Sequence, residues 1–236
     1  MYIKHPLVLT FAMSTLALSA RAQMLGAPVL QNAFTNRGFT VGVDFGTSND
    51  LTSYGAAAAW SPMSEKYQFS AGVGYLDPKN GSATATYGAR LMVPVLNRSS
   101  AFGVAPFVGM GGANFSGVND WQIPLGITGG YRRALGASGR GISAYVSPFY
   151  SWARIRRNQK TETHGQFRTS IGVDAVVLPR MGVTVGYELG QKATDEEAGA
   201  RGGIFGVGVS YALHKPGTER ARKPRAPRGA ARDSTP

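Results

Sequence analysis

The sequence predicts an all-β protein whose strands form an up-and-down antiparallel barrel. Its composition is one reason: glycine makes up 32 of 236 residues, close to twice the usual share of about 7%, and each glycine weakens a helix interior by about 1 kcal/mol relative to alanine. The second reason is an alternation of apolar with small or polar residues from residue 39 to residue 213, which is typical of strands. A hydrophobic share of 43% and the absence of cysteine exclude a largely disordered chain, a disulfide framework and thiol chemistry.

The first 22 residues are typical of a secretory signal peptide. Lys4 supplies the positive start, residues 7–18 form a short apolar run, and Ala20-Arg21-Ala22 provides the small residues of a cleavage site. We therefore expect residues 1–22 to be removed on export and residues 23–38 to form a short leader before the first strand.

The alternation divides into ten runs, and each run has one apolar face and one face of small or polar residues. In chain order the runs span residues 39–47, 52–61, 66–75, 83–96, 101–114, 121–133, 142–153, 166–178, 181–190 and 203–213. The third run shows the pattern most clearly: Tyr67, Phe69, Ala71, Val73 and Tyr75 share one face, and Gln68, Ser70, Gly72 and Gly74 share the other. The sequence predicts ten strands, with eight as the alternative.

The fifth and seventh runs have an ambiguous phase. Pro106 and Phe107 occupy adjacent positions, as do Pro148 and Phe149, so the bulky residues do not keep to one face. Proline also removes one N–H group from a strand ladder. We expect Pro106, Pro124 and Pro148 to mark bulges.

Alternating strands fit a soluble sandwich, whose apolar face is a core, or a membrane barrel, whose apolar face meets lipid. Runs of about 9–14 residues suit a tilted membrane crossing better than the usual soluble strand of about 5–6. The second face carries few charges, whereas a sandwich surface in water would carry many Lys and Glu. These features favour the membrane barrel, and a secreted soluble β-domain is the alternative.

Aromatic residues at both ends of the apolar faces also favour a membrane. Tyr and Trp suit the membrane–water interface because one edge of the ring is apolar and the other can form a hydrogen bond. The predicted aromatic girdle comprises Trp60, Tyr67, Tyr131 and Tyr211 at one rim, and Tyr75, Trp121, Tyr150, Trp152 and Tyr187 at the other.

An even number of strands places both chain ends on one side, which we expect to be the periplasm. The predicted periplasmic turns lie near residues 61–66, 97–100, 134–141 and 178–181. The predicted outer loops lie near residues 48–51, 76–82, 115–120, 154–165 and 191–203. The two longest loops are both on the outer side, which is the usual asymmetry of such barrels.

The last run contains Gly208-Val-Ser-Tyr211-Ala-Leu213, a glycine followed by two alternating apolar residues. With this ending and its strand pattern, the chain over residues 23–213 resembles the small bacterial outer-membrane β-barrel proteins of the opacity-protein and outer-membrane-protein-X type. The resemblance implies a place in the bacterial outer membrane, contact with its lipid and lipopolysaccharide, and Gly208, Tyr211 and Leu213 as a signal for the barrel-assembly machinery. Many members end at a terminal aromatic residue, whereas this chain continues for 23 residues, so an ordinary amphipathic last strand is the alternative.

Residues 214–236 form a basic tail. Seven Lys or Arg residues stand against Glu219 and Asp233, an excess of +5 within the net charge of +12. Interspersed proline and glycine without an apolar face predict disorder. The tail is expected either to be solvated or to contact an anionic envelope partner, such as phospholipid headgroups or cell-wall carboxylates. Nucleic acid is not expected as a partner, because the tail lacks aromatic residues and the chain is exported.

Charged residues on the inward face define a predicted lumen cluster, which consists of Asp44, Arg90, Arg132, Arg168, Asp174 and Glu188. Hairpin pairing around residues 178–181 places Glu188 diagonally close to Arg168. Charges inside a narrow barrel must pair or be hydrated. The cluster therefore predicts either a salt-bridged plug or a thin pore whose arginine excess favours small anions.

Enzyme chemistry has one weak candidate, His164 in a predicted outer loop. Glu162 would orient it, and Ser151 or Thr163 lies nearby, but no catalytic motif surrounds these residues. Three acidic residues of the last outer loop are interpreted as solvated rather than as a metal site: Asp195, Glu196 and Glu197. We expect no catalytic residue, metal or cofactor. The sequence thus predicts a non-enzymatic envelope protein, structural or surface-binding through its outer loops, with a narrow pore for small solutes and a rim hydrolase using His164 as alternatives.

Overall fold

The computed structural model describes residues 37–49, 51–62, 64–79, 82–96, 100–115, 118–135, 140–157, 160–190 and 203–213. The predicted signal peptide, nearly all of the predicted leader and the basic tail lie outside these residues. Within the described ranges, no helix is both long and apolar enough to cross a membrane.

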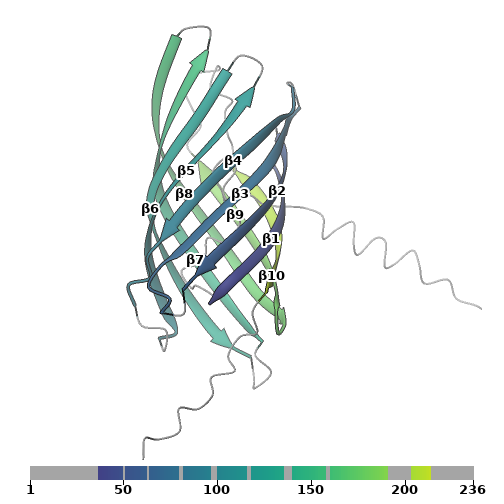
Figure 1. Ribbon diagram of the computed structural model, residues 1–236, viewed down its shortest axis with the longest axis vertical. Coiled ribbons are helices and arrows are strands. Elements are labelled where there is room, and N and C mark those ends of the chain that lie inside the picture. The colour runs from purple at the N-terminus through teal and green to yellow at the C-terminus, as the bar shows by residue number, and fades with distance from the viewer. Residues whose placement is uncertain are drawn as a thin grey trace, which may run out of the picture.

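Ten strands follow one another along the chain. They are β1 (Gly38–Thr47), β2 (Leu51–Ser61), β3 (Gln68–Pro78), β4 (Thr84–Met92), β5 (Phe102–Phe115), β6 (Val118–Ala134), β7 (Gly141–Arg157), β8 (Lys160–Leu178), β9 (Met181–Gly190) and β10 (Ile204–Ala212). Each strand pairs antiparallel with the next, and β10 pairs with β1, which closes the barrel (Figure 1). The prediction of an up-and-down ten-strand barrel is confirmed, and the eight-strand alternative is wrong.

The strands are strongly sheared relative to one another. Following paired residues from Asp44 through β2, β3, β4 and β5 leads to Asp120 of β6. Following them the other way, through β10, β9, β8 and β7, leads to Arg132 of the same strand. Residues 132 and 120 differ by 12, and this difference is the shear of the closed barrel. Strands in such barrels tilt by about 40° from the axis.

The apolar faces of the strands point outward and the polar faces point into the lumen. Phe69 is 48% exposed and Val93 is 43% exposed, whereas Ser70 and Gln68 beside Phe69 are buried. Val207, on the outward face of β10, is half-buried. In a sandwich these three apolar residues would share a dry core. The alternative of a soluble sandwich is therefore wrong.

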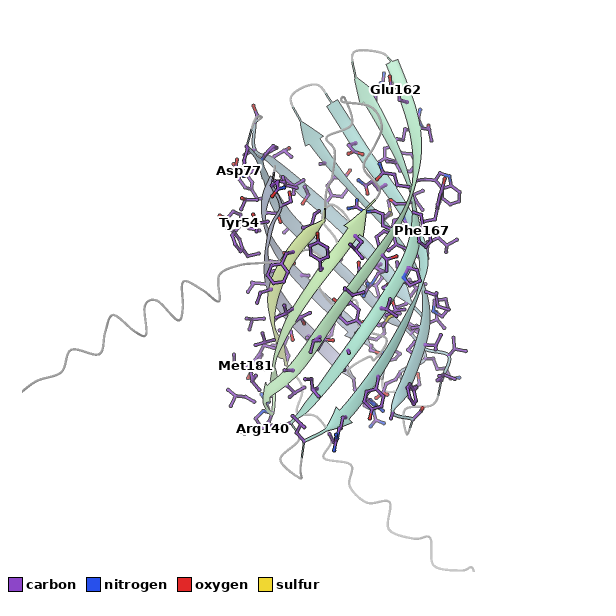
Figure 2. All side chains as sticks on the ribbon, turned by 180° about the vertical axis from the view of Figure 1, so that it is seen from behind. Tyr54, Asp77, Arg140, Glu162, Phe167 and Met181 are labelled. Carbon is purple, nitrogen blue, oxygen red and sulfur yellow. The ribbon has the colours of Figure 1, made fainter. Side chains whose placement is uncertain are left out.

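The strands differ in length around the wall. β1 to β4, β9 and β10 contain 9–11 residues, whereas β6, β7 and β8 contain 17, 17 and 19. The ends of β5 to β8 therefore stand above the rest of the barrel (Figure 1). We call this the long-hairpin end; the opposite end holds the start of β1 and the end of β10. Figure 2 shows Glu162 of β8 well above Asp77 of β3, with Arg140 and Met181 at the opposite end.

Two of the predicted loops are wrong for the same reason. Residues 154–157 and 160–165 pair as a ladder instead of forming the predicted loop 154–165, and most of the predicted loop 115–120 belongs to β5 and β6. The polar composition of these segments suggested loops. However, Thr161 and Thr163 are β-branched residues that suit strands, and the cross-strand ladder simply continues beyond the apolar band.

The three strand prolines do not mark bulges. Pro106 pairs with Ile127, Pro124 with Ser151 and Pro148 with Thr169, all without a change of register. The carbonyl of Pro106 still accepts a hydrogen bond from the N–H of Val93 at 3.0 Å. The ladder therefore tolerates the missing N–H groups, and the register shift of β8 against β9 lies instead between Val176 and Leu178.

Candidate functional site: the barrel lumen and the long-hairpin rim

All six residues of the predicted lumen cluster are on the inward faces of their strands. Four of them are buried, with exposed fractions of 7% for Asp44, 2% for Arg90, 4% for Arg168 and 0% for Glu188. Asp174 and Arg132 are half-buried. The barrel wall thus brings charges from β1, β4, β8 and β9 into one narrow interior.

Arg168 and Glu188 form a buried ion pair. Nε of Arg168 lies 2.6 Å from Oε1 of Glu188. The two residues are diagonal neighbours, because Glu188 pairs with Ser170 and Arg168 pairs with Gly190. Opposite charges this close attract strongly when they are removed from water, so the pair favours the register in which β8 and β9 bring these two residues together.

Asp174 sits in a polar row across three strands. The hydroxyl of Thr184 donates to Oδ1 of Asp174 at 2.5 Å, and the hydroxyl of Ser143 donates to Oδ2 at 3.4 Å. Ser143, Asp174 and Thr184 are directly paired on β7, β8 and β9. The carboxylate is therefore satisfied from both sides within the wall.

Arg90 is held by an aromatic ring. Its guanidinium carbon lies 5.4 Å from the centroid of Phe107, a cation–π contact. Asp44 is related through β2 and β3 to Thr86 of β4. A shear of 12 residues over ten strands is about 1.2 residues per strand, so three strand steps move the level residue about four positions on, to Arg90. Arg90 and Asp44 therefore face the lumen at the same height.

Apolar residues fill the lumen beside Arg90. Phe107 and Phe149 meet with centroids 6.1 Å apart, and Met92 and Ala105 complete this buried cluster. Phe107 and Phe149 were not predicted as lumen residues, because the adjacent prolines made it ambiguous which face each phenylalanine occupies. The signal that could have found them is Gly126, which pairs with both and leaves room between them.

Tyr145 of β7 is a further lumen residue that was not predicted from the sequence. It is buried and pairs directly with Gly172 of β8. A Cβ atom on Gly172 would lie 2.5 Å from the Tyr145 hydroxyl oxygen. An inward glycine opposite an inward tyrosine is the pattern that could have revealed it.

Several buried polar atoms of the lumen find no hydrogen-bond partner among the described residues. They include Nε and Nη2 of Arg90 and the hydroxyl oxygens of Thr40, Ser53, Thr86, Tyr145 and Ser170. Buried polar groups that lack a protein partner are normally satisfied by water. The lumen therefore combines a packed apolar cluster with positions suited to ordered water.

Aromatic side chains form two outward bands. Trp60, Tyr67, Tyr131 and Tyr211 are exposed near the opposite end, and Tyr75, Trp121, Tyr150 and Trp152 are exposed toward the long-hairpin end. Tyr187, which was predicted for the same rim, is half-buried and lies nearly level with Asp44, near the middle of the wall. Rings contact within each band, with centroids 5.8 Å apart for Trp60 and Tyr67 and 5.0 Å apart for Tyr150 and Trp152. The role of these residues as an interfacial girdle stays a prediction.

The residues of the predicted assembly signal lie at the closing seam. Gly208 pairs with Asp44 and Tyr211 pairs with Val41 of β1. Tyr211 and Leu213 are exposed on the outward face, and the N–H of Leu213 donates to the carbonyl of Phe39 at 2.9 Å. Their role in assembly stays a prediction.

The residues considered for catalysis all lie in the ladder of β7 and β8. His164 lies within β8 opposite Ala153 rather than in a loop. The Ser151 hydroxyl is buried in the lumen and donates to Oε1 of Gln122 at 3.3 Å. In the described part of the chain, no three His, Asp or Glu residues group closely enough to hold a metal ion.

No family model and no curated protein matches this sequence significantly. Among solved structures, the chain is similar to the β domain of the Bordetella autotransporter BrkA, with a TM-score of 0.51 and 14% identity over 75% of this chain and 100% of that chain. Neisserial surface protein A overlaps more loosely, with a TM-score of 0.37 and 13% identity over 74% of this chain and 96% of that chain. The KdgM porin also overlaps loosely, with a TM-score of 0.39 and 9% identity over 74% of this chain and 99% of that chain. The chain therefore shares its overall fold with the β domain of BrkA.

Proposed function

We propose that this protein is an integral, non-enzymatic protein of the bacterial outer membrane, a closed barrel that presents the β5–β6 and β7–β8 hairpins at the cell surface for binding. The observation that carries the proposal is the contrast between the occupied lumen and the two long hairpins. The middle of the lumen is filled by Arg90, Phe107 and Phe149, with the Arg168–Glu188 ion pair in the same narrow interior, while the two hairpins extend beyond the apolar band.

The outward surface supports membrane embedding. Strands of 9–11 residues rise about 25 Å when tilted by about 40°, which is the height of the apolar band of outer-membrane barrels. Val43, Val73 and Leu125 are more than half exposed within this height. Such a surface would be unfavourable in water and is favourable against acyl chains.

The long hairpins support a role at the surface. Beyond Trp152, β7 continues for five residues to Arg157, which adds about 12 Å at the strand rise and tilt of a barrel. The exposed side chains there are polar or charged, as in Arg154, Arg156 and Glu162. Segments carried clear of a rigid scaffold are common positions for binding.

Epitope insertion tests the orientation. An epitope inserted between residues 158 and 159 should be labelled by antibody on intact cells, and the same epitope inserted between residues 137 and 138 should be labelled only after the outer membrane is permeabilised. Heat-modifiable migration on a gel shows that each variant still forms the barrel. Labelling of the second site on intact cells would reverse the proposed orientation.

Planar-bilayer recording tests the closed lumen. We expect no stepwise conductance from the purified protein, and stepwise openings from a Phe107→Ala/Phe149→Ala variant, because the paired rings fill the lumen. Stepwise conductance of the unmodified protein would contradict the closed barrel.

A narrow pore is the second candidate function, because the buried polar atoms around Arg90 need water. If ordered waters connect through the lumen, the unmodified protein should conduct small anions in small steps, and Arg90→Gln should reduce their anion preference. Unchanged selectivity in Arg90→Gln would argue against this candidate.

A further inference from the structure

The outward face of β7 changes character at one height. Tyr150, Trp152, Arg154 and Arg156 alternate along it, so two aromatic rings are followed by two arginines on the same face. All four side chains are exposed. The aromatic pair belongs to the aromatic band at the long-hairpin end, which we call the upper band. The two arginines lie directly above this band.

The neighbouring strands frame Arg154. On one side it pairs with Trp121 of β6, another ring of the upper band, and on the other side with Thr163 of β8. Arg156 pairs with Thr161 of β8. Both threonines are exposed, so their hydroxyls are available as additional donors on the same face.

Within the described ranges, no acidic side chain shares this outward face with the two arginines. Glu162 alternates with the two threonines and therefore faces the inner side of the hairpin. Among the described residues, neither Arg154 nor Arg156 takes part in an ion pair. The outward face thus presents two arginines whose Cα atoms lie one pleat repeat, or about 7 Å, apart, and the described part of the chain places no anion beside them.

Their height matches a headgroup layer. Arg154 lies two residues beyond Trp152, a rise of about 5 Å along the axis of a tilted strand. Tryptophan at a membrane boundary marks the level where acyl chains meet polar headgroups. The arginines therefore reach the depth of headgroup phosphates, which guanidinium groups bind in bidentate fashion.

We propose that Arg154 and Arg156, framed by Trp121, Trp152 and Thr163, form a binding site for the phosphate groups of an anionic lipid in the outer leaflet. This inference rests on the proposed function, because it requires the aromatic band to lie at the membrane surface. The lipid packs its acyl chains on the apolar wall below, and its phosphates contact the two arginines above.

Native mass spectrometry of the full chain tests the site with diphosphoryl lipid A as the probe and the same lipid without phosphates as the comparison. We expect the unmodified protein to retain diphosphoryl lipid A about tenfold better than the dephosphorylated lipid. R154Q/R156Q should lose this preference. The matched control R133Q/R140Q removes two exposed arginines at the opposite end and should keep it.

The site would be overturned by the absence of a preference in the unmodified protein, by a preference retained in R154Q/R156Q, or by an equal loss in the control variant, which would indicate net charge alone. Inorganic phosphate at millimolar concentration should not displace the lipid; displacement would identify a free anion as the ligand instead. If R154Q/R156Q loses binding to an acidic protein while the unmodified protein shows no lipid preference, the surface binds a protein partner, and the lipid site is overturned. Heat-modifiable migration of all variants separates these outcomes from failure of the proposed function, in which the barrel itself would not form.

Discussion

Phe107 and Phe149 lie on β5 and β7, two strands that do not pair with each other, yet their ring centroids are 6.1 Å apart. Gly126 of β6 pairs with both residues and places no side chain between them. A Cβ atom on Gly126 would lie 2.4 Å from Cβ of Phe149 and 2.6 Å from the carbonyl oxygen of Pro148. Neither atom can move without the backbone, so the glycine is what allows the rings to meet.

Gly126→Ala should therefore destabilise the barrel. We expect the free energy of unfolding to fall by about 1–3 kcal/mol, the usual cost of overpacking, as measured by urea-induced unfolding in lipid vesicles. Gly129→Ala is the matched control on the same strand, because the nearest atom to its added Cβ is Cγ1 of Val146 at 3.9 Å. Equal losses in the two variants would contradict a steric role for Gly126.

The Arg168–Glu188 pair should show a large penalty for removing one partner only. Both side chains are buried, with exposed fractions of 4% and 0%, so Glu188→Leu leaves a buried cation and should cost about 3 kcal/mol of unfolding free energy. Arg168→Met combined with Glu188→Leu should recover most of that loss. Additive losses in the double variant would show that the two side chains do not act as a pair.

Charge on the outward wall should be tolerated only outside the apolar band. Val73 of β3 is 65% exposed within the band, and Val73→Arg should cost about 2–4 kcal/mol in lipid vesicles, as expected for a cation near the bilayer midplane. Thr161→Arg, on the same outward face but above the band, should cost less than about 1 kcal/mol. A small cost at both positions would mean that the wall does not face lipid.

The outward pair at the end of β10 should affect assembly more than stability. Tyr211 and Leu213 are 40% and 55% exposed, so replacing both by serine removes little packing within the barrel. If they are read by the assembly machinery, Tyr211→Ser/Leu213→Ser should lower the fraction of heat-modifiable barrel in cell envelopes severalfold. Phe205→Ser, also outward on β10, should not. A similar loss in the Phe205 variant would point to general strand hydrophobicity instead of a signal.

Much of the wall was predictable from the sequence because alternation is a local property. Tyr67, Phe69 and Val73 fall on one face of any extended strand, and their outward position follows once the other face is too poor in charge for a water-facing surface. Gln68 and Ser70 fall on the opposite face of the strand, which points into the lumen, and are therefore buried. The polar composition around Thr161 and Thr163 led to the wrong prediction of a loop. A strand that extends beyond the apolar band no longer needs an apolar face, so its polarity resembles that of a loop.

The sequence by itself predicted ten strands, with eight as the alternative, their antiparallel order, and the two faces of all but the fifth and seventh runs, since a period of two needs only neighbours along the chain. The tertiary structure alone decided which side chains share a height inside the barrel. Arg90 comes level with Asp44, and Phe107 reaches Phe149, only because ten registers add up to a shear of 12 residues. No single strand contains that sum, so the packing of the lumen and the height of the arginines above the aromatic band become visible only when the barrel is closed.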